Sequence, residues 1–299
     1  ECGLAHFVEH LLFKGTKHRT AKELTLAVEG VGGYLNAYTT EDHTCYYAKA
    51  AAGHFRQVSQ VLTEMYVDAA FSKTEVERER EVIREEILSC RDMPTQWVED
   101  LLSGALWPGH ALGSPLTGTE EDVLRYKAAD LREFHQKHYS AGNTVFTVAG
   151  PMSHQEVLEA VSGELLRLPE AKLVKAKRVP SGMCPSVCVE EVSTEQVHVG
   201  VGFYGESRKD ELRYAFRLLS VILGENMSSR LFQELREKRG YCYSVQSSTV
   251  LLEDVGALLI FTDLDGAKLG KAAKGIKREI DRLSQREVSG AELRRAKDY

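Results

Sequence analysis

The chain has 299 residues, of which 43% are hydrophobic and 27% charged, and its formal net charge is −6 at pH 7. This length suggests two domains, each with a core of its own. The modest acidic balance, without runs of about five or six like charges, argues against nucleic acid or an anionic membrane surface as a partner. No stretch of about eighteen apolar residues occurs that could cross a membrane.

The first predicted element is an amphipathic helix over residues 1–13, which contains His6, Glu9 and His10 in the order H-x-x-E-H. Residues four apart on a helix lie on the same face, so the two histidines can offer nitrogens to one metal ion while Glu9 stands beside them. The neighbouring side chains are apolar, and burying these polar groups without a partner would be costly. The pattern therefore favours a metal site over a purely structural pair of histidines.

The next elements are a helix and a hairpin. Thr20 is a predicted N-cap for a helix that runs through Val28. A run rich in tyrosine and threonine follows over residues 34–50 and is broken at residues 40–42, which predicts two strands joined by a turn.

A third metal ligand must come from elsewhere in the chain. The predicted helix over residues 75–87 carries Glu79 and Glu86 seven residues apart, which is about two turns on one face. Its first half alternates acidic and basic residues, as a solvated face with ion pairs does. Glu86 fits that interpretation less well because Val82, Ile83 and Ile87 indicate a buried end, so Glu86 is the better candidate ligand. Two histidines and one glutamate form the ligand set of a catalytic zinc site.

The remaining elements complete two similar halves. Helices are predicted over 97–107, 128–139, 153–161, 212–223, 228–238 and from 268, and strands over 143–149, 196–203, 243–250 and 255–262. A stretch with prolines and little periodicity, residues 169–188, is the predicted linker. We therefore predict an α+β fold with two related domains, residues 1–168 and 189–299, each an antiparallel sheet with helices packed on it. Only the first domain carries H-x-x-E-H.

These features resemble the inverzincins, the pitrilysin and insulysin family of zinc metallopeptidases, in the short two-domain branch that includes the mitochondrial processing peptidases. The similarity extends over nearly the whole chain. It is carried by residues 3–16 around H-x-x-E-H and by residues 32–39, 116–119, 134–139 and 228–232. Family members have further strands and helices, so the resemblance implies that the first domain is truncated at its N-terminal end and the second at its C-terminal end.

The resemblance implies roles for the candidate residues. In this family the third zinc ligand is the later glutamate of an E-x6-E pair, which is Glu86 here, and Glu79 is expected to orient a ligand. One zinc ion per chain would then be held by His6, His10 and Glu86. With zinc activating a water molecule, Glu9 is expected to take the proton of that water as it attacks the scissile carbonyl.

Two further pairs follow from the same resemblance. Asn36 and Ala37 match the strand that holds an extended substrate by main-chain hydrogen bonds. Arg236 and Tyr243 match an Arg and Tyr pair that contacts substrate near the zinc, where a guanidinium can hold a carbonyl and a phenol can donate to an oxyanion. A helix-capping arginine and a core tyrosine are the ordinary alternatives for this second pair.

The expected function is that of a zinc-dependent endopeptidase acting on extended or unfolded peptides. Family chambers contain four domains, so the resemblance implies a homodimer, or a heterodimer with a related subunit. Six scattered cysteines favour a reducing compartment, either the bacterial cytoplasm or the mitochondrial matrix. The alternative is a non-catalytic scaffold or partner subunit, although such relatives tend to lose a ligand or the base. A metal-storage module would need no general base.

Overall fold

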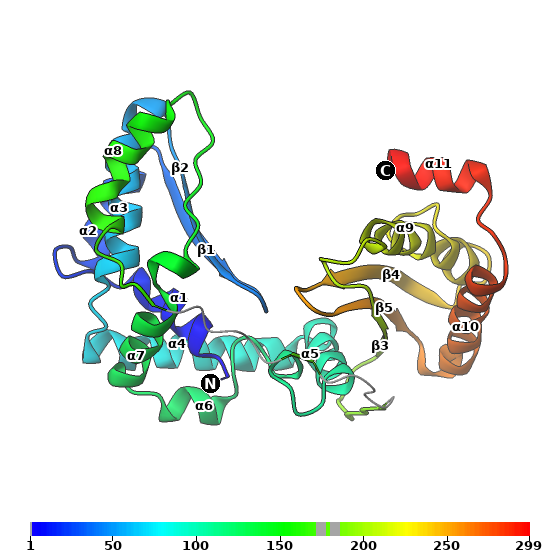
Figure 1. Cartoon of the computed structure of the whole chain (residues 1–299). Coiled ribbons are helices and arrows are strands. Elements are labelled where there is room, and N and C mark those ends of the chain that lie inside the picture. Colours follow the sequence, from blue (N-terminus) through cyan, green and yellow to red (C-terminus); the bar gives the residue numbers. More distant parts are fainter. Residues whose placement is uncertain (1, 172–177, 180–185) are drawn as a thin grey trace. The chain divides into compact units, whose positions relative to one another are not determined.

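The chain folds into two compact units. The structure is a computed structural model that describes residues 2–171, 178–179 and 186–299. Unit 1 comprises Glu1–Ser89 and Pro115–Lys177, and unit 2 comprises Cys90–Ser114 and Arg178–Tyr299. The strands pair in antiparallel fashion in both units and helices accompany each sheet (Figure 1), which confirms the predicted α+β class.

Unit 1 is mainly helical and contains one hairpin. The hairpin consists of β1 (Tyr34–Thr39) and β2 (Thr44–Lys49), with Tyr34 opposite Lys49 and Thr39 opposite Thr44. The helices are α1 (Leu4–Leu12), α2 (Ala21–Glu29), α3 (Phe55–Asp68), α4 (Lys73–Asp92), α6 (Glu120–Arg125), α7 (Ala128–His138) and α8 (His154–Leu165).

Helix α1 lies at the centre of the unit 1 core. Its apolar residues recur at helical spacing, which turns one stripe of the helix inward. They pack against α2, α3, α4 and α7, and the buried residues of this core include Phe7, Val8, Leu11, Leu12, Leu24, Met65, Ile83 and Leu131. The buried stripe fixes the rotation of α1 and leaves His6, Glu9 and His10 half-buried at the edge of the core.

Local signals set the helix ends in unit 1. The Thr20 hydroxyl accepts from the backbone N–H of Glu23, whose carboxylate accepts from the N–H of Thr20, so Thr20 is the predicted N-cap of α2. Helices α3 and α4 separate at Phe71. This buried residue has a φ of 46°, which a continuous helix does not allow.

Unit 2 is built on a three-stranded sheet. Its strands β3 (Val197–Gly205), β4 (Cys242–Leu251) and β5 (Gly256–Leu264) lie in the order β3-β5-β4. The helices are α5 (Pro94–Leu106), α9 (Arg213–Leu223), the π-helical turn η4 (Phe232–Glu237), α10 (Leu269–Gln285) and α11 (Gly290–Asp298). The core lies between the sheet and α9, η4 and α10, with Leu223, Leu231, Leu235, Ile260 and Leu264 buried.

The division of the chain differs from the predicted one at residues 90–114. These residues were expected in the first domain, but they pack with unit 2 because α5 covers strand β3. The close approach needs glycine: a Cβ on Gly202 would lie 2.8 Å from a methyl carbon of Leu106. Helical periodicity shows that a helix has an apolar face, but not which sheet it covers. Most of the predicted linker, at 172–177 and 180–185, lies outside the described residues.

The strand predicted over residues 143–149 does not form. After a short 3-10 turn at Ala141–Asn143 the chain runs without pairing to a described strand, and Val145 is 87% exposed. A run of β-forming residues becomes a strand only where a neighbour supplies the ladder of hydrogen bonds. Its composition alone was therefore misleading.

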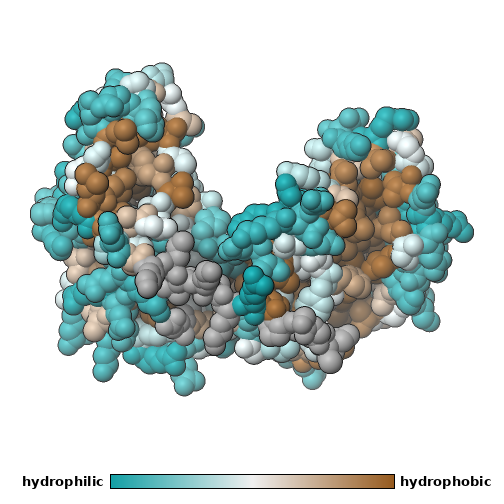
Figure 2. Space-filling model, viewed as in Figure 1, coloured by the Kyte–Doolittle hydropathy of each residue, from teal (hydrophilic) through white to brown (hydrophobic). Residues whose placement is uncertain are grey.

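Apolar side chains reach the surface in both units. Figure 2 shows them, in brown, on the visible face of each unit and bordered by hydrophilic residues. Within the described residues, no helix combines the length and the apolar character that crossing a bilayer requires.

Candidate metal centre

Helices α1 and α4 bring three metal-ligand side chains together in unit 1. His6 and His10 stand one turn apart on α1 with ring centroids 4.6 Å apart, and Glu86 faces them from α4. Oε1 of Glu86 is 3.6 Å from Nε2 of His6, and its Oε2 is 3.6 Å from Nε2 of His10. Ligand atoms of the three residues all lie within 4.8 Å of one another, and this is the one such group of His, Cys, Asp or Glu found among the described residues.

The spacing and the donor types fit zinc. Atoms that each lie about 2.1 Å from a tetrahedral ion are about 3.4 Å from one another. The two His–Glu distances of 3.6 Å are near this value and too long for hydrogen bonds. Two imidazole nitrogens and one carboxylate would leave a fourth position open, which is the arrangement of a catalytic site.

The protonation states also suit a cation. Burial, with a smaller contribution from His10, lowers the pKa of His6 to about 4, so His6 is neutral at pH 7 and has the form that binds metals. Burial raises the pKa of Glu86, an effect that His10 opposes and Glu9 reinforces. A cation among these groups would offset the cost of burying the Glu86 carboxylate.

Glu79 contacts His10 from the side away from Glu86. Its Oε2 lies 3.1 Å from Nδ1 of His10, and its Oε1 lies 2.6 Å from Nζ of Lys14. Burial alone would raise the pKa of Glu79, but the hydrogen bonds from His10 and Lys14 outweigh it and lower this pKa. Glu79 thus lies beside His10, one of the candidate ligands, and Lys14 is a contact that the sequence did not reveal. The sequence offered one indication of this contact, because Lys14 lies four residues after His10.

Glu9 stands on the same helix and is held from the hairpin. The Thr39 hydroxyl donates a hydrogen bond to Oε2 of Glu9, and Thr39 also lies 3.0 Å from the hydroxyl of Thr44. No described residue has a hydrogen bond to the other oxygen, Oε1. Thr39 was not predicted as a site residue. The alternation of exposed and half-buried residues along β1 indicates that Thr39 points inward, because Thr39 lies on the same side of the strand as Leu35.

Asn36 and Ala37 lie in the middle of β1, opposite Tyr47 and Tyr46 of β2. Within the described residues the hairpin is a two-stranded sheet, so the far edge of β1 has no strand paired to it. The Asn36 side chain is exposed, and its Oδ1 accepts from the N–H of Ala37 at 2.8 Å. An edge of this kind can accept an extended peptide as a further strand.

Comparison with known protein families assigns the chain to a family. The profile described as insulinase (peptidase family M16) matches residues 1–120, and the profile described as the peptidase M16 inactive domain matches residues 125–299. An uncharacterized zinc protease of Bacillus subtilis is 33% identical over 99% of the chain, which spans 72% of that relative. The chain belongs to peptidase family M16. This confirms the resemblance to the insulysin family.

Other relatives agree with the assignment to M16. An uncharacterized zinc protease of Streptomyces coelicolor is 34% identical over 98% of the chain, which spans 66% of that relative. Among solved structures, a Helicobacter pylori protease has a TM-score of 0.89 at 25% identity, covering 99% of this chain and 73% of that one. A peptidase M16 inactive domain from Pseudomonas fluorescens has a TM-score of 0.91 at 20% identity, with the same coverage, and supports the fold.

Arg236 and Tyr243 of this M16 chain belong to unit 2 and stand on two backbone irregularities. Arg236 lies in the π-helical turn η4, and Tyr243 lies where the register between β4 and β5 shifts from Cys242 to Ser244. The guanidinium carbon is 5.6 Å from the centre of the Tyr243 ring. Tyr243 is 75% exposed, so it is not a core tyrosine. π-Turns and bulges are often found at functional sites, where they re-aim side chains.

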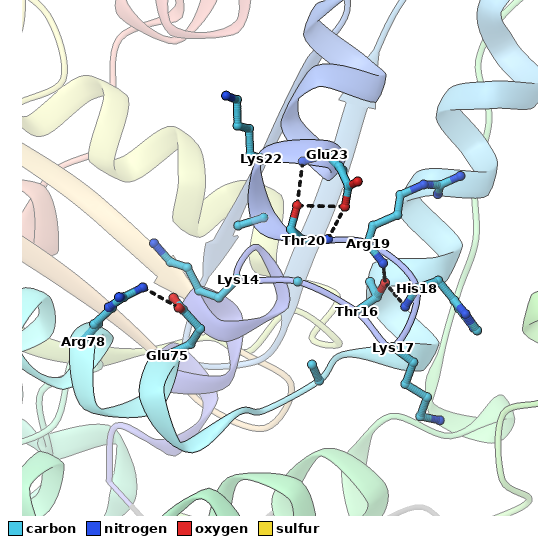
Figure 3. Close-up of a pocket in the computed structure, with 13 residues that line it drawn as sticks. Lys14, Thr16, Lys17, His18, Arg19, Thr20, Lys22, Glu23, Glu75 and Arg78 are labelled. Carbon is cyan, nitrogen blue, oxygen red and sulfur yellow. Dashed lines mark hydrogen bonds and ion pairs between the residues drawn. The ribbon is translucent and has the colours of Figure 1, made fainter.

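A hollow in unit 1, of about 520 Å³, lies between the end of α1 and the start of α2 (Figure 3). Its lining is rich in cations, but most of them pair with carboxylates. The pairs are Lys14 with Glu79, Lys17 with Asp68, Arg19 with Glu64 and Arg78 with Glu75. This pairing leaves little net charge to attract an anion, so the hollow supports the fold rather than marking a second site.

Proposed function

We propose that this M16 chain is part of a zinc-dependent endopeptidase. The observation that carries the proposal is the meeting of His6, His10 and Glu86 in unit 1, with Glu9 one residue before His10 and not itself among the ligand atoms. One zinc ion per chain matches one such group. The names of the relatives in B. subtilis and S. coelicolor, both zinc proteases, support the choice of metal and of reaction class.

Bound zinc would supply Lewis acidity, which polarises the scissile carbonyl and makes water a stronger acid. Glu9 would take the proton of the attacking water and later pass it to the leaving amine. Because Thr39 binds Oε2, the free Oε1 is the oxygen available for that proton. Glu79 and Lys14 would keep the His10 ring in its ligand orientation.

The substrate is proposed to be an extended or unfolded peptide. Such a peptide could add to the free edge of β1 along Asn36 and Ala37 through main-chain hydrogen bonds, which do not depend on side chains. Folded proteins rarely offer a free strand of this kind. Arg236 would hold a substrate carbonyl and Tyr243 would donate to the oxyanion, in agreement with the exposure of the Tyr243 side chain.

The assembly is proposed to be a dimer, either of two copies or of this chain with a related subunit. The support is the family resemblance, in which chambers contain four domains, together with the separation of the proposed roles between unit 1 and unit 2. The alternative function is that of a non-catalytic scaffold subunit. Such a subunit would bind a peptide or a partner without turnover.

Zinc analysis combined with a peptide-cleavage assay tests the proposal. The protein should contain one zinc per chain and cleave an unstructured peptide, and Glu9→Gln should keep zinc while turnover falls by about 10²- to 10⁴-fold. Glu86→Gln should lower the zinc content, whereas Glu85→Gln, its exposed neighbour on α4, should not. A protein that binds zinc yet cleaves no unstructured peptide would support the scaffold alternative.

A further inference from the structure

A series of hydroxyl groups leads from the aromatic cluster of unit 1 to Glu9. Thr39 donates to Oε2 of Glu9, and Thr44 lies 3.0 Å from Thr39, oxygen to oxygen. Tyr139 lies near Thr44, and its hydroxyl is 2.7 Å from that of Tyr46. The members come from β1, β2 and the end of α7, so three separate parts of the chain meet in this series.

The direction of the hydrogen bond between the two threonines follows from the one at Glu9. A hydroxyl has a single hydrogen to donate, and a carboxylate can only accept. Thr39 gives its hydrogen to Glu9, so it must accept from Thr44. Thr44 gives its hydrogen to Thr39, so toward Tyr139 it can only accept. The hydroxyl dipoles of Thr44 and Thr39 therefore point the same way, toward the carboxylate, and such chains strengthen each bond through polarisation.

The tyrosines are suited to act as donors. Burial raises the pKa of Tyr139 and that of Tyr46, and the nearby carboxylate of Glu9 adds to both shifts. Both hydroxyls therefore keep their hydrogens at neutral pH. A buried phenol also needs a hydrogen-bond partner, which the series provides for each.

The hairpin end that carries Thr39 and Thr44 is held firmly. The two threonines are the last directly opposite pair of the hairpin. The turn beyond them is closed by a 2.8 Å hydrogen bond from the N–H of Thr40 to the carbonyl of His43, and the Thr40 hydroxyl lies 3.0 Å from Nδ1 of His43. A base held by groups on a rigid element keeps its orientation better than one held by a loop.

We propose that Thr39 and Thr44 are positioning residues, which fix the Glu9 carboxylate as the final acceptor of a directed series of hydroxyl groups. The inference rests on the proposed role of Glu9 as general base. It adds that strand β1 has two tasks, since the strand whose edge would hold the peptide also carries the hydroxyl that orients the base. A movement of this strand would shift the substrate and the base together.

Steady-state kinetics of the zinc-loaded protein test the proposal. Thr39→Val keeps the shape of the side chain and removes the hydroxyl, so kcat should fall by about 10- to 100-fold, as for other groups that orient a catalytic residue. KM and the zinc content should stay within about twofold, because neither ligands nor the peptide edge change. Thr39→Ser restores the hydroxyl and should recover most of kcat.

The other members supply graded variants and a control. Thr44→Val should lower kcat less than Thr39→Val does, and Tyr139→Phe should lower it least, since both residues act on Glu9 through Thr39. Tyr66→Phe is the matched control: its ring centre is 4.9 Å from that of Tyr139, but its hydroxyl bonds to Thr144 outside the series. It should leave kcat unchanged. A fall in kcat with Tyr66→Phe equal to that with Tyr139→Phe would show that packing, and not the series, is responsible.

Thermal unfolding gives a readout that needs no activity. Thr39→Val should lower Tm by about 2–4 °C in the native background and by clearly less in Glu9→Ala, where the acceptor is gone. Equal Tm shifts in the native and Glu9→Ala backgrounds would overturn the proposal. A Thr39→Val protein that keeps full kcat, while Glu9→Gln is inactive, would also overturn it. If neither the native protein nor any variant cleaves peptides, the proposed function fails. The two Tm shifts still decide in that case whether Thr39 holds Glu9.

Discussion

Nζ of Lys14 lies 2.6 Å from Oε1 of Glu79. Glu79 is buried and its other oxygen is 3.1 Å from His10, so one lysine supports the carboxylate that supports a proposed metal ligand. Lys14→Met keeps the aliphatic part of the side chain but removes this support. We expect zinc affinity to fall by about 10-fold, the lower end of the range for partners behind a ligand.

Competition with a chelator of known affinity measures this effect. Lys22→Met is the matched control, because Lys22 is an exposed lysine that lines the same hollow of unit 1 as Lys14 does (Figure 3). Its zinc affinity should equal that of the native protein. An unchanged affinity in Lys14→Met would mean that Glu79 does not need the lysine to hold His10.

Gly118 is expected to be intolerant of any side chain. It has a φ of 80° and faces Gly3, the N-cap of α1, whose φ is 75°; a Cβ on Gly118 would lie 3.0 Å from Cα of Gly3. Gly118→Ala should therefore lower the free energy of unfolding by about 1–3 kcal/mol through backbone strain and the close contact. Chemical denaturation measures the change.

Gly163 provides the opposite expectation within the same unit. It lies inside α8 with open space around the position of a Cβ, and its φ is not in the left-handed region. Gly163→Ala should raise the free energy of unfolding by up to about 1 kcal/mol, since alanine favours helix. If both alanine variants destabilised the protein equally, the strain assigned to Gly118 would be wrong.

The sequence predicted those parts of the site that depend on local geometry. His6 and His10 come together because residues four apart share a helix face, whatever the rest of the fold does. Glu86 lies far from the histidines in the sequence. The apolar residues around Glu86 favoured it over Glu79 as the third ligand, but only the family resemblance selected it. The structure separates these two glutamates clearly: Glu86 faces both histidines, and Glu79 faces the back of His10 alone.

Contacts between distant elements were beyond the reach of the sequence. The bond from Thr39 to Glu9 depends on how the hairpin packs against α1, and the alternation along β1 shows only which side of the strand faces inward. The 143–149 run failed as a strand for a related reason, because pairing depends on a partner that composition cannot reveal. The packing of residues 90–114 with unit 2 likewise depends on which sheet offers a glycine-lined face to α5.

His135 should make stability depend on pH. Burial lowers its pKa below the ordinary value of 6.5, although the hydrogen bond to the carbonyl of Tyr66, at 2.8 Å, opposes the shift. Below pH 6.5 the unfolded chain therefore binds more protons than the folded one, and folding stability falls as pH decreases, by up to about 1.4 kcal/mol per pH unit. Above pH 6.5 this group contributes no pH dependence.

Urea unfolding at pH 7.5 and at pH 5.5 measures this contribution. His135→Gln removes the titrating group and keeps a donor for the Tyr66 carbonyl. The loss of stability between the two pH values should be larger in the native protein than in the variant, and other groups cancel in the comparison. The same loss in both proteins would show that His135 is not held in its neutral form by the fold.

Subunit mixing can show whether Arg236 and Tyr243 act on the zinc site of a partner. If the proposed dimer is symmetric and the pair acts between subunits, a Glu9→Gln chain supplies the tyrosine that a Tyr243→Phe chain lacks, and the latter supplies the base. Half of the dimers in an equal mixture should be mixed, each with one complete site, so activity should return to about one quarter of the native value. Mass spectrometry of intact dimers would establish that exchange has occurred. Mixed dimers without activity would place the pair within its own chain, or outside the reaction, because an arrangement within one chain leaves every site in the mixture incomplete.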